Sequence, residues 1–363
     1  MTDMKDITPL MEWGLFTEPR PCIIAGPCSA ETEEQVMDTA RQLKSVGINV
    51  FRAGIWKPRT HPGSFEGIGQ EGLEWLKKVK SELGMHVAVE VANKEHVQAS
   101  LEAGVDLLWI GARTTVSPFI MQEIADTLKG KDVAVLVKNP LAQDLELWIG
   151  ALERLYNAGL RKIGVIHRGF TTSNSAPYRN DPHWQTIIEM RRRYPHIPMF
   201  CDPSHIAGCR DFIPELSQKS MDLGLDGLMV EVHRNPSEAW SDAKQQLTPE
   251  AFRQMLWALK VRAKDIASSQ VNRDLHVLRA RIDALDDVLL NVLQNRMDVS
   301  REIGKCKKKA NMTSLQTSRW DEVLSTMVRK GAEVGLSKKT IIEIFSAIHE
   351  ASIEVQNKII SGE

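Results

Sequence analysis

The chain has 363 residues, a formal net charge of −1 and 42% hydrophobic residues, so its length permits two domains with a sizeable core. Because the charges balance, the composition gives no indication of a nucleic acid or an anionic membrane as a partner, and we expect neither. No apolar run could cross a bilayer and the first residues lack the apolar stretch of a secretory signal, which predicts a cytoplasmic protein.

Eight short apolar segments recur in the first two thirds of the chain at intervals that suit a strand followed by a helix. They cover residues 22–26, 50–54, 87–91, 107–111, 133–137, 163–167, 199–202 and 228–232. Amphipathic stretches such as 33–46 and 122–128 lie between them. Continuous apolar strands with helical crossovers indicate a parallel sheet that is buried on both faces. Eight such units favour an α/β fold of the (β/α)8 (TIM) barrel type, with an open doubly wound sheet as the alternative.

After Lys264 the strand pattern stops and helical periodicity begins. We expect three helices, over roughly 271–310, 318–334 and 337–360, with Ser337 as the N-cap of the last one. The predicted domains are a barrel at 1–264, a linker at 265–273 and an all-α domain at 274–363. The linker segment could also continue as helix.

Charged residues follow nearly every predicted strand, at the end where barrels of this type carry their chemistry. Six cations would meet at one mouth and repel one another, so two phosphorylated substrates are expected there; these cations are Arg52, Lys57, Arg59, Arg113, Lys138 and Arg168. The segment Lys57-Pro58-Arg59-Thr60 combines two cations and a hydroxyl on a loop stiffened by proline, which suits phosphate and carboxylate groups. A solvated turn is the alternative for this segment.

Four metal-capable residues, Cys28, His205, Glu231 and Asp242, also follow strands. Taken singly, Cys28 is typical of a buried thiol and His205 of a hydrogen-bonded core histidine. Their joint placement favours a borderline divalent ion such as Mn, Fe, Co or Zn. The five cysteines, an odd number without framework spacing, argue against a disulfide scaffold.

These motifs resemble 3-deoxy-D-arabino-heptulosonate 7-phosphate (DAHP) synthase over about residues 20–260. The similarity is carried by Gly26-Pro-Cys-Ser29, Arg52 through Thr60, Ile110-Gly-Ala-Arg-Thr114, Asp202-Pro-Ser-His205 and residues 226–233. The chain is similar to the short, metal-dependent type I-beta subgroup because little precedes the first strand. It departs from many members at Lys138-Asn-Pro140, where they have Lys-Arg-Gly.

The resemblance implies condensation of phosphoenolpyruvate with erythrose 4-phosphate in the shikimate pathway of aromatic amino-acid biosynthesis. On this resemblance Cys28, His205, Glu231 and Asp242 hold one divalent metal ion per barrel, with Mn favoured over Fe, Co or Zn. Phosphoenolpyruvate would be bound by Arg52, Lys57, Arg113, Lys138, Arg168 and His205. Erythrose 4-phosphate would be bound by Lys57, Pro58, Arg59 and Thr60, with Lys57 as the catalytic, proton-handling residue. A relative that uses arabinose 5-phosphate is an alternative, against which the loop at 57–60 argues.

The helical tail carries an apolar seam at alternating spacings of three and four. It consists of Leu275, Leu278, Ile282, Leu285, Leu289 and Val292, and Arg296 falls inside its continuation. Arg296 is either a snorkelling side chain or a buried cation for an anionic ligand. On one continuous helix Arg279 and Arg296 would lie about 25 Å apart, and Arg296 and Lys307 about 16 Å apart. If all three share a site, Arg279 comes from a second subunit, which predicts a helix-swapped homodimer and leaves higher oligomers open.

Residues 275–360 resemble the all-helical class of chorismate mutase through residues 278–286, Arg296, Gly304-Lys-Cys-Lys307, Arg319 and the pair Ser352 and Gln356. The resemblance implies a dimer that rearranges chorismate to prephenate, with Arg296 and Lys307 as catalytic residues. Chorismate would be bound by Arg279, Arg296, Lys307, Arg319, Ser352 and Gln356. The chain departs from the best-known pattern at Gln316 and Trp320, where acidic residues can occur. The alternative is an allosteric sensor that binds chorismate or prephenate and throttles the barrel.

Overall fold

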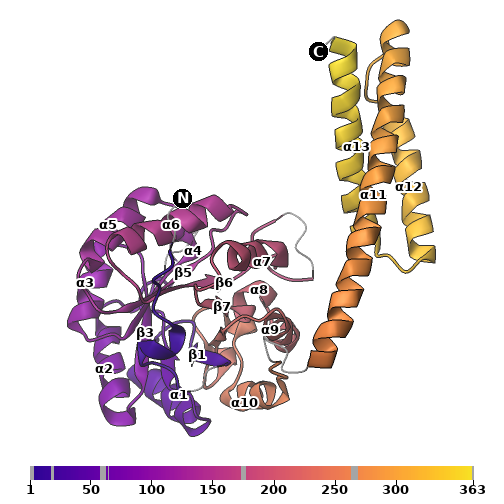
Figure 1. Ribbon diagram of the computed structural model, residues 1–363. Coiled ribbons are helices and arrows are strands. Elements are labelled where there is room, and N and C mark those ends of the chain that lie inside the picture. Colours follow the sequence, from indigo (N-terminus) through magenta and orange to yellow (C-terminus); the bar gives the residue numbers. More distant parts are fainter. Residues whose placement is uncertain are drawn as a thin grey trace. The chain divides into compact units, whose positions relative to one another are not determined.

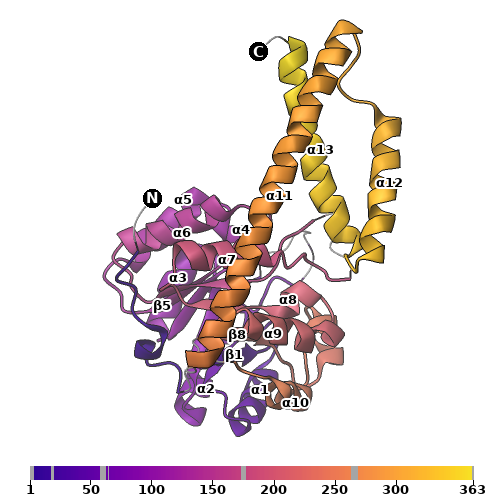
Figure 2. The same ribbon diagram turned by 45° about the vertical axis from the view of Figure 1, so that its right-hand side comes forward.

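The computed structural model describes residues 4–17, 20–57, 63, 65–172, 177–262 and 269–361. The chain divides into two compact units, Met1–Lys264 and Asp265–Glu363, which are described separately. In Figures 1 and 2 the first unit is a ring of strands surrounded by helices, and the second consists of helices alone. None of the described helices is both long and apolar enough to span a membrane.

The first unit is a closed barrel of eight parallel strands, each paired with its neighbours in chain order and β8 paired with β1. The strands are β1 (Cys22–Gly26), β2 (Val50–Arg52), β3 (His86–Val91), β4 (Leu107–Ile110), β5 (Ala134–Lys138), β6 (Ile163–His167), β7 (Met199–Cys201) and β8 (Gly227–Glu231). The predicted TIM barrel is therefore confirmed, and the alternative of an open sheet is wrong.

Helices connect the strands and cover the outside of the barrel (Figure 1). They are α1 (Glu33–Ser45), α2 (Glu71–Leu83), α3 (Lys94–Glu102), α5 (Pro118–Leu128), α6 (Leu145–Asn157), α7 (Trp184–Arg193), α9 (Ile213–Asp222) and α10 (Pro249–Ala258), with the short α4 (Ala112–Thr115) and α8 (Pro203–Ala207) directly after β4 and β7. Side chains fix several starts: Thr32 Oγ1 accepts from the Gln35 amide at 3.1 Å, and Asn93 Oδ1 accepts from the His96 amide at 2.8 Å.

The two-residue period of the strands decides which side chains reach the inside of the barrel. On β5, Ala134 and Leu136 belong to the inner apolar cluster, whereas Val135 and Val137 belong to the larger cluster with the helices. Lys138 continues the inner series and ends at the carboxyl end of the strand. On other strands the same two-residue spacing leads from the inner apolar cluster to a polar residue on the inner face. These residues are Arg52, Glu90, Arg168, Asp202 and Glu231. The apolar core below therefore ends in a layer of charged side chains.

The second unit consists of α11 (Ser269–Lys309), α12 (Thr317–Glu333) and α13 (Lys338–Ser361), with α13 packed against both other helices. Three helices were expected, and Ser337 caps the last by accepting from the Thr340 amide at 3.1 Å. Since α11 begins at Ser269, the last part of the segment predicted as a linker is helical. Residues 263–268 lie outside the described residues, and the domain boundary at Lys264 stays a proposal.

Trp148 on α6 anchors this helix to the barrel. Its side chain is fully buried and its Nε1 donates to the Val137 carbonyl oxygen at 3.1 Å. Trp148→Phe removes the donor and part of the ring, so we expect the free energy of unfolding to fall by about 1–3 kcal/mol. Urea unfolding followed by circular dichroism measures the change. Trp257→Phe is the matched control, because Trp257 is 72% exposed. Equal stabilities of the two variants would contradict the prediction.

Candidate active sites

Cys28, Glu231 and Asp242 bring one sulfur and two carboxylate oxygens together at the carboxyl end of the barrel. One ligand atom from each lies within 4.8 Å of the others, and Cys28 Sγ is 3.3 Å from Asp242 Oδ2. Cys28 and Glu231 are completely buried. Two carboxylates beside a thiol in so small a space are costly to bury without a cation, so this donor set fits a divalent ion between them.

His205, the fourth predicted ligand, borders this cluster. Its Nε2 lies 3.8 Å from Glu231 Oε1 and its Nδ1 lies 2.8 Å from Asp202 Oδ2. Asp202 also accepts from the His205 amide at 3.0 Å. A carboxylate at Nδ1 orients the ring and leaves Nε2 to face a metal, as is usual for metal-binding histidines. Asp202 is therefore the residue that holds His205 in place.

Burial and charge both affect protonation in this cluster. Burial, followed by the nearby Glu231 carboxylate, raises the pKa of Cys28 to about 12. For Glu231 burial acts upward, but His205 and Arg52 outweigh it, so its pKa is lowered. Without a metal the site thus holds a neutral thiol beside an ionised carboxylate. Metal binding would require the thiol to lose its proton.

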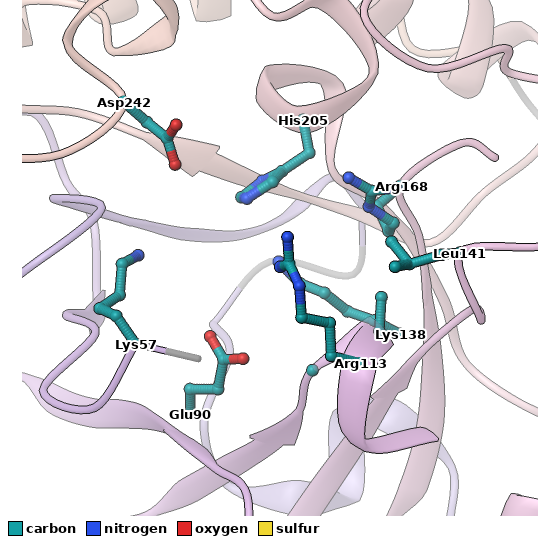
Figure 3. A pocket seen from close by; sticks show the side chains of 10 residues that line it. Lys57, Glu90, Arg113, Lys138, Leu141, Arg168, His205 and Asp242 are labelled. Carbon is teal, nitrogen blue, oxygen red and sulfur yellow. The ribbon is translucent and has the colours of Figure 1, made fainter. Parts of the chain in front are cut away.

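A polar pocket of about 70 Å³ lies beside the cluster (Figure 3). Its side chains come from different strand ends and include Lys57, Glu90, Arg113, Lys138, Arg168, His205 and Asp242. Figure 3 shows Lys57 and Asp242 on one side of the pocket and Arg168 on the other. The structure therefore brings four of the predicted cations to one small space that opens beside the metal-capable residues.

The cations of this pocket differ in how far they are neutralised. Lys138 Nζ lies 2.8 Å from Asp202 Oδ2, and Lys57 Nζ donates to both Sγ and the carbonyl oxygen of Cys28 at 2.8 Å. Arg168 donates to Asn180 Oδ1 at 3.0 Å, and burial lowers its pKa to about 10. A buried guanidinium held by neutral groups remains cationic at neutral pH and suits an anionic ligand.

Arg52 is not among the residues that line this pocket. It is buried, pairs with Glu231 at 3.3 Å and stacks over the Trp109 ring at 4.7 Å. Its Nε and Nη1 have no hydrogen-bond partner in the described part of the chain. Three other predicted residues, Pro58, Arg59 and Thr60, lie outside the described residues.

Sequence reasoning missed several supporting side chains. Gln245 donates to Glu231 Oε2 at 2.7 Å, and Gln246 Oε1 accepts from the Cys28 amide at 2.9 Å. Arg179 pairs with Asp242 at 3.2 Å. No motif marks these residues, because they reach the site from loops. Glu90 could have been assigned to the site from the sequence, since it is the last inner-face residue of β3, which ends at Val91.

The helical unit has a cavity of about 410 Å³ between its three helices. Five of the predicted chorismate residues line it: Arg296, Lys307, Arg319, Ser352 and Gln356. Arg296 donates to Ser352 Oγ at 2.5 Å, and Ser352 is only 4% exposed. Arg279 does not line the cavity and is exposed. Gln316 and Trp320 line it as well, together with His349, which no motif or periodicity had marked.

Two family models match the chain, one to each unit. The DAHP synthetase I family matches residues 17–265, and the type II chorismate mutase family matches residues 278–357. Among curated proteins, the phospho-2-dehydro-3-deoxyheptonate aldolase of Thermotoga maritima is 35% identical over 247 residues, covering 68% of this chain and 70% of the relative. The 2-dehydro-3-deoxyphosphooctonate aldolase of Francisella tularensis subsp. holarctica is 30% identical, covering 66% and 90%.

Solved structures agree with the family models. The crystal structure of the Thermotoga maritima phospho-2-dehydro-3-deoxyheptonate aldolase (DAHP synthase) superimposes with a TM-score of 0.60 at 34% identity, covering 65% of this chain and 67% of that one. A truncated form of 3-deoxy-D-arabino-heptulosonate 7-phosphate synthase from the same organism gives a TM-score of 0.57 at 31% identity, covering 65% and 84%. The chain therefore belongs to the DAHP synthetase I family and carries, after its barrel, a type II chorismate mutase domain, which makes it a fusion of two enzyme domains of aromatic biosynthesis.

Proposed function

We propose that the barrel condenses phosphoenolpyruvate with erythrose 4-phosphate and water, releasing DAHP and inorganic phosphate. The observation that carries this proposal is the convergence of Lys57, Arg113, Lys138 and Arg168 beside the cluster of Cys28, Glu231 and Asp242. Four cations around one small pocket suit a substrate with a phosphate and a carboxylate group. The cations hold both reactants at near-attack distance and stabilise the charge that moves.

The metal is a second part of the proposal. Cys28, His205, Glu231 and Asp242 would hold one divalent ion, with Mn favoured and Fe, Co or Zn as alternatives. Such an ion supplies Lewis acidity toward the aldehyde oxygen. Asp202 supports this assignment, because it orients the imidazole of His205.

The protein's own groups would carry the remaining steps. The enol carbon of phosphoenolpyruvate attacks the aldehyde carbon, water adds at carbon 2, and phosphate leaves by cleavage of its C–O bond. Lys57 lines the pocket and its Nζ lies 2.8 Å from Cys28 Sγ, which supports its role as the donor of a proton to the former aldehyde oxygen. Arg168 and Arg113 would bind anionic groups of phosphoenolpyruvate. The proposed roles of Pro58, Arg59 and Thr60 in binding the aldose phosphate rest on sequence alone.

For the helical unit we propose rearrangement of chorismate to prephenate. The cavity gathers the cations Arg296, Lys307 and Arg319, which would meet the two carboxylates and the ether oxygen of chorismate. This reaction needs no covalent step, only a compact conformer and stabilisation of the breaking C–O bond. All six ligand-type residues are present in the chain and five of them line the cavity, which favours catalysis over a purely sensory role. Feedback on the barrel by chorismate or prephenate remains compatible with it.

We further propose that the helical unit dimerises and that Arg279 acts in the cavity of a second subunit. The first part of α11 exposes an apolar stripe to solvent, including Leu278 (50%), Ile282 (57%), Leu285 (68%) and Leu289 (55%). A stripe of this size on a single chain indicates a partner. Arg279 lies on the same part of α11, outside the cavity that its proposed ligand would occupy.

The metal site can be tested with Asp242→Asn. The variant removes one anionic ligand, so we expect the affinity for Mn²⁺ to fall by about 10²-fold or more. Isothermal titration of the chelator-treated protein measures the change. Asp132→Asn is the matched control, because the Asp132 side chain is 82% exposed and pairs with Lys162 on the surface. Unchanged Mn²⁺ affinity in Asp242→Asn would remove Asp242 from the site.

The condensation is tested with the wild-type chain and Lys57→Met. We expect the wild type to release phosphate from phosphoenolpyruvate when erythrose 4-phosphate is added, and much less when arabinose 5-phosphate replaces it. Lys57→Met should lower kcat by at least about 10²-fold and still bind Mn²⁺, because its loss removes the proton donor and no metal ligand. Retained turnover in this variant would exclude Lys57 from proton transfer, and preference for arabinose 5-phosphate would refute the proposed substrate.

The swapped dimer is tested by mixing Arg279→Gln with Arg296→Gln chains. Each variant alone should lose most mutase activity. With random mixing, half of the dimers contain one chain of each variant. If every cavity takes Arg279 from the partner, such a dimer has one intact and one defective cavity, so about one quarter of the wild-type activity should return. Chorismate consumption after co-refolding measures the recovery. No recovery in a sample shown to contain mixed dimers would mean that both arginines act within one chain.

A further inference from the structure

The cavity of the helical unit offers cations and neutral groups to a ligand. Its charged lining residues are Arg296, Lys307 and Arg319, and no carboxylate lines it in the part of the chain that the structure describes. At the positions where acidic residues were an alternative, Gln316 and Trp320 line the wall instead. A ligand with two carboxylates is matched by the cations. Its hydroxyl group, however, needs a neutral partner or an acceptor from another residue.

His349 and Trp320 form one wall of this cavity as a stacked pair. Their rings lie parallel within 12°, with centroids 4.1 Å apart. His349 comes from α13 and Trp320 from α12, so the stack links these two helices at one wall of the cavity. A ring held in this way has little freedom to turn, and its nitrogen atoms keep a fixed direction.

The Nε2 atom of His349 is buried and has no hydrogen-bond partner among the described residues. A buried polar atom without a partner costs free energy, and a ligand hydroxyl in the cavity that His349 lines would supply the missing partner. Burial, followed by the positive charges of Arg296 and Lys307, lowers the pKa of His349, so the imidazole is neutral at neutral pH. A neutral ring with its proton on Nδ1 presents Nε2 as an acceptor.

We propose that His349 is a further substrate-binding residue of the mutase cavity, whose Nε2 accepts a hydrogen bond from the ring hydroxyl of chorismate while Trp320 positions the imidazole. The inference rests on the proposed mutase function. The nearby Ser352 hydroxyl is already engaged, because it accepts from Arg296 and donates to the Ile348 carbonyl oxygen at 2.8 Å. Among the described residues Gln356 Oε1 is a second buried acceptor of the cavity without a partner, and Gln356 is assigned to chorismate on independent grounds.

The test compares two substrates on the full-length chain. His349→Phe keeps a flat ring for the stack and removes the acceptor. We expect kcat/KM for chorismate to fall about tenfold, as is typical for the loss of one neutral hydrogen bond. For an analogue in which hydrogen replaces the ring hydroxyl, wild type and His349→Phe should differ by less than about twofold, because the lost bond no longer exists. His349→Gln, with an amide oxygen of similar reach, should restore part of the loss.

Further variants test whether Trp320 acts through His349 and whether the effect is specific to this position. Trp320→Ala should weaken chorismate conversion and add little to His349→Phe in the double variant, because both remove the same contact. Glu350→Gln, an exposed neighbour on α13, is the matched control and should behave as wild type. His349→Leu replaces His349→Phe if the latter does not fold. An equal penalty on both substrates, or no penalty, would overturn the inference while leaving the mutase function intact. A wild-type chain that leaves chorismate unchanged would refute both.

Discussion

The pairing of buried charges at the carboxyl end of the barrel is the constraint on which the first site depends. Glu231 lies at its centre, because it pairs with Arg52, accepts from Gln245 and borders both Cys28 and His205. A second set joins Lys138, Asp202 and His205. Each of these charges would be costly to bury alone, and together they lower one another's cost. The same pairing holds the metal-capable atoms and the cations in fixed positions before any substrate arrives, which is the requirement for electrostatic stabilisation of a reaction.

The helical unit also gathers charged side chains around a cavity, but those that the structure describes are cations alone. Its cavity collects three cations without a carboxylate among the described lining residues. Arg319 pairs with Glu322 at 2.6 Å, and an anionic ligand would meet the remaining positive charge. The remaining wall includes neutral polar and aromatic groups, among them the stacked pair of Trp320 and His349. Both sites therefore suit small anionic ligands, one with a metal-capable cluster beside it and one without. Two sites of this kind on one chain suit two reactions of one pathway that both act on small carboxylates.

Much of the fold and part of the barrel site were predictable from the sequence. The eight strands and three helices follow from apolar periodicity, and the inner parity of the strands points Arg52, Lys138 and Glu231 to the barrel mouth. Other features of the structure could not be predicted from the sequence, for physical reasons. The start of α11 at Ser269 could not be read from the residues of the expected linker, because helix propensity there does not distinguish a turn from a continued helix. Gln245, Gln246 and Arg179 were missed because loop residues have no periodicity that would reveal their direction.

The sequence by itself determined the order of strands and helices, the residues at the strand ends and the two families, because all of these depend on local pattern and motif. Only the tertiary structure decided which of these residues meet. It placed Arg52 over Trp109 instead of in the pocket wall, brought Lys138 to Asp202, and set His349 against Trp320. Such contacts join residues far apart in the chain, and their geometry follows from barrel closure and helix packing, which no short segment specifies.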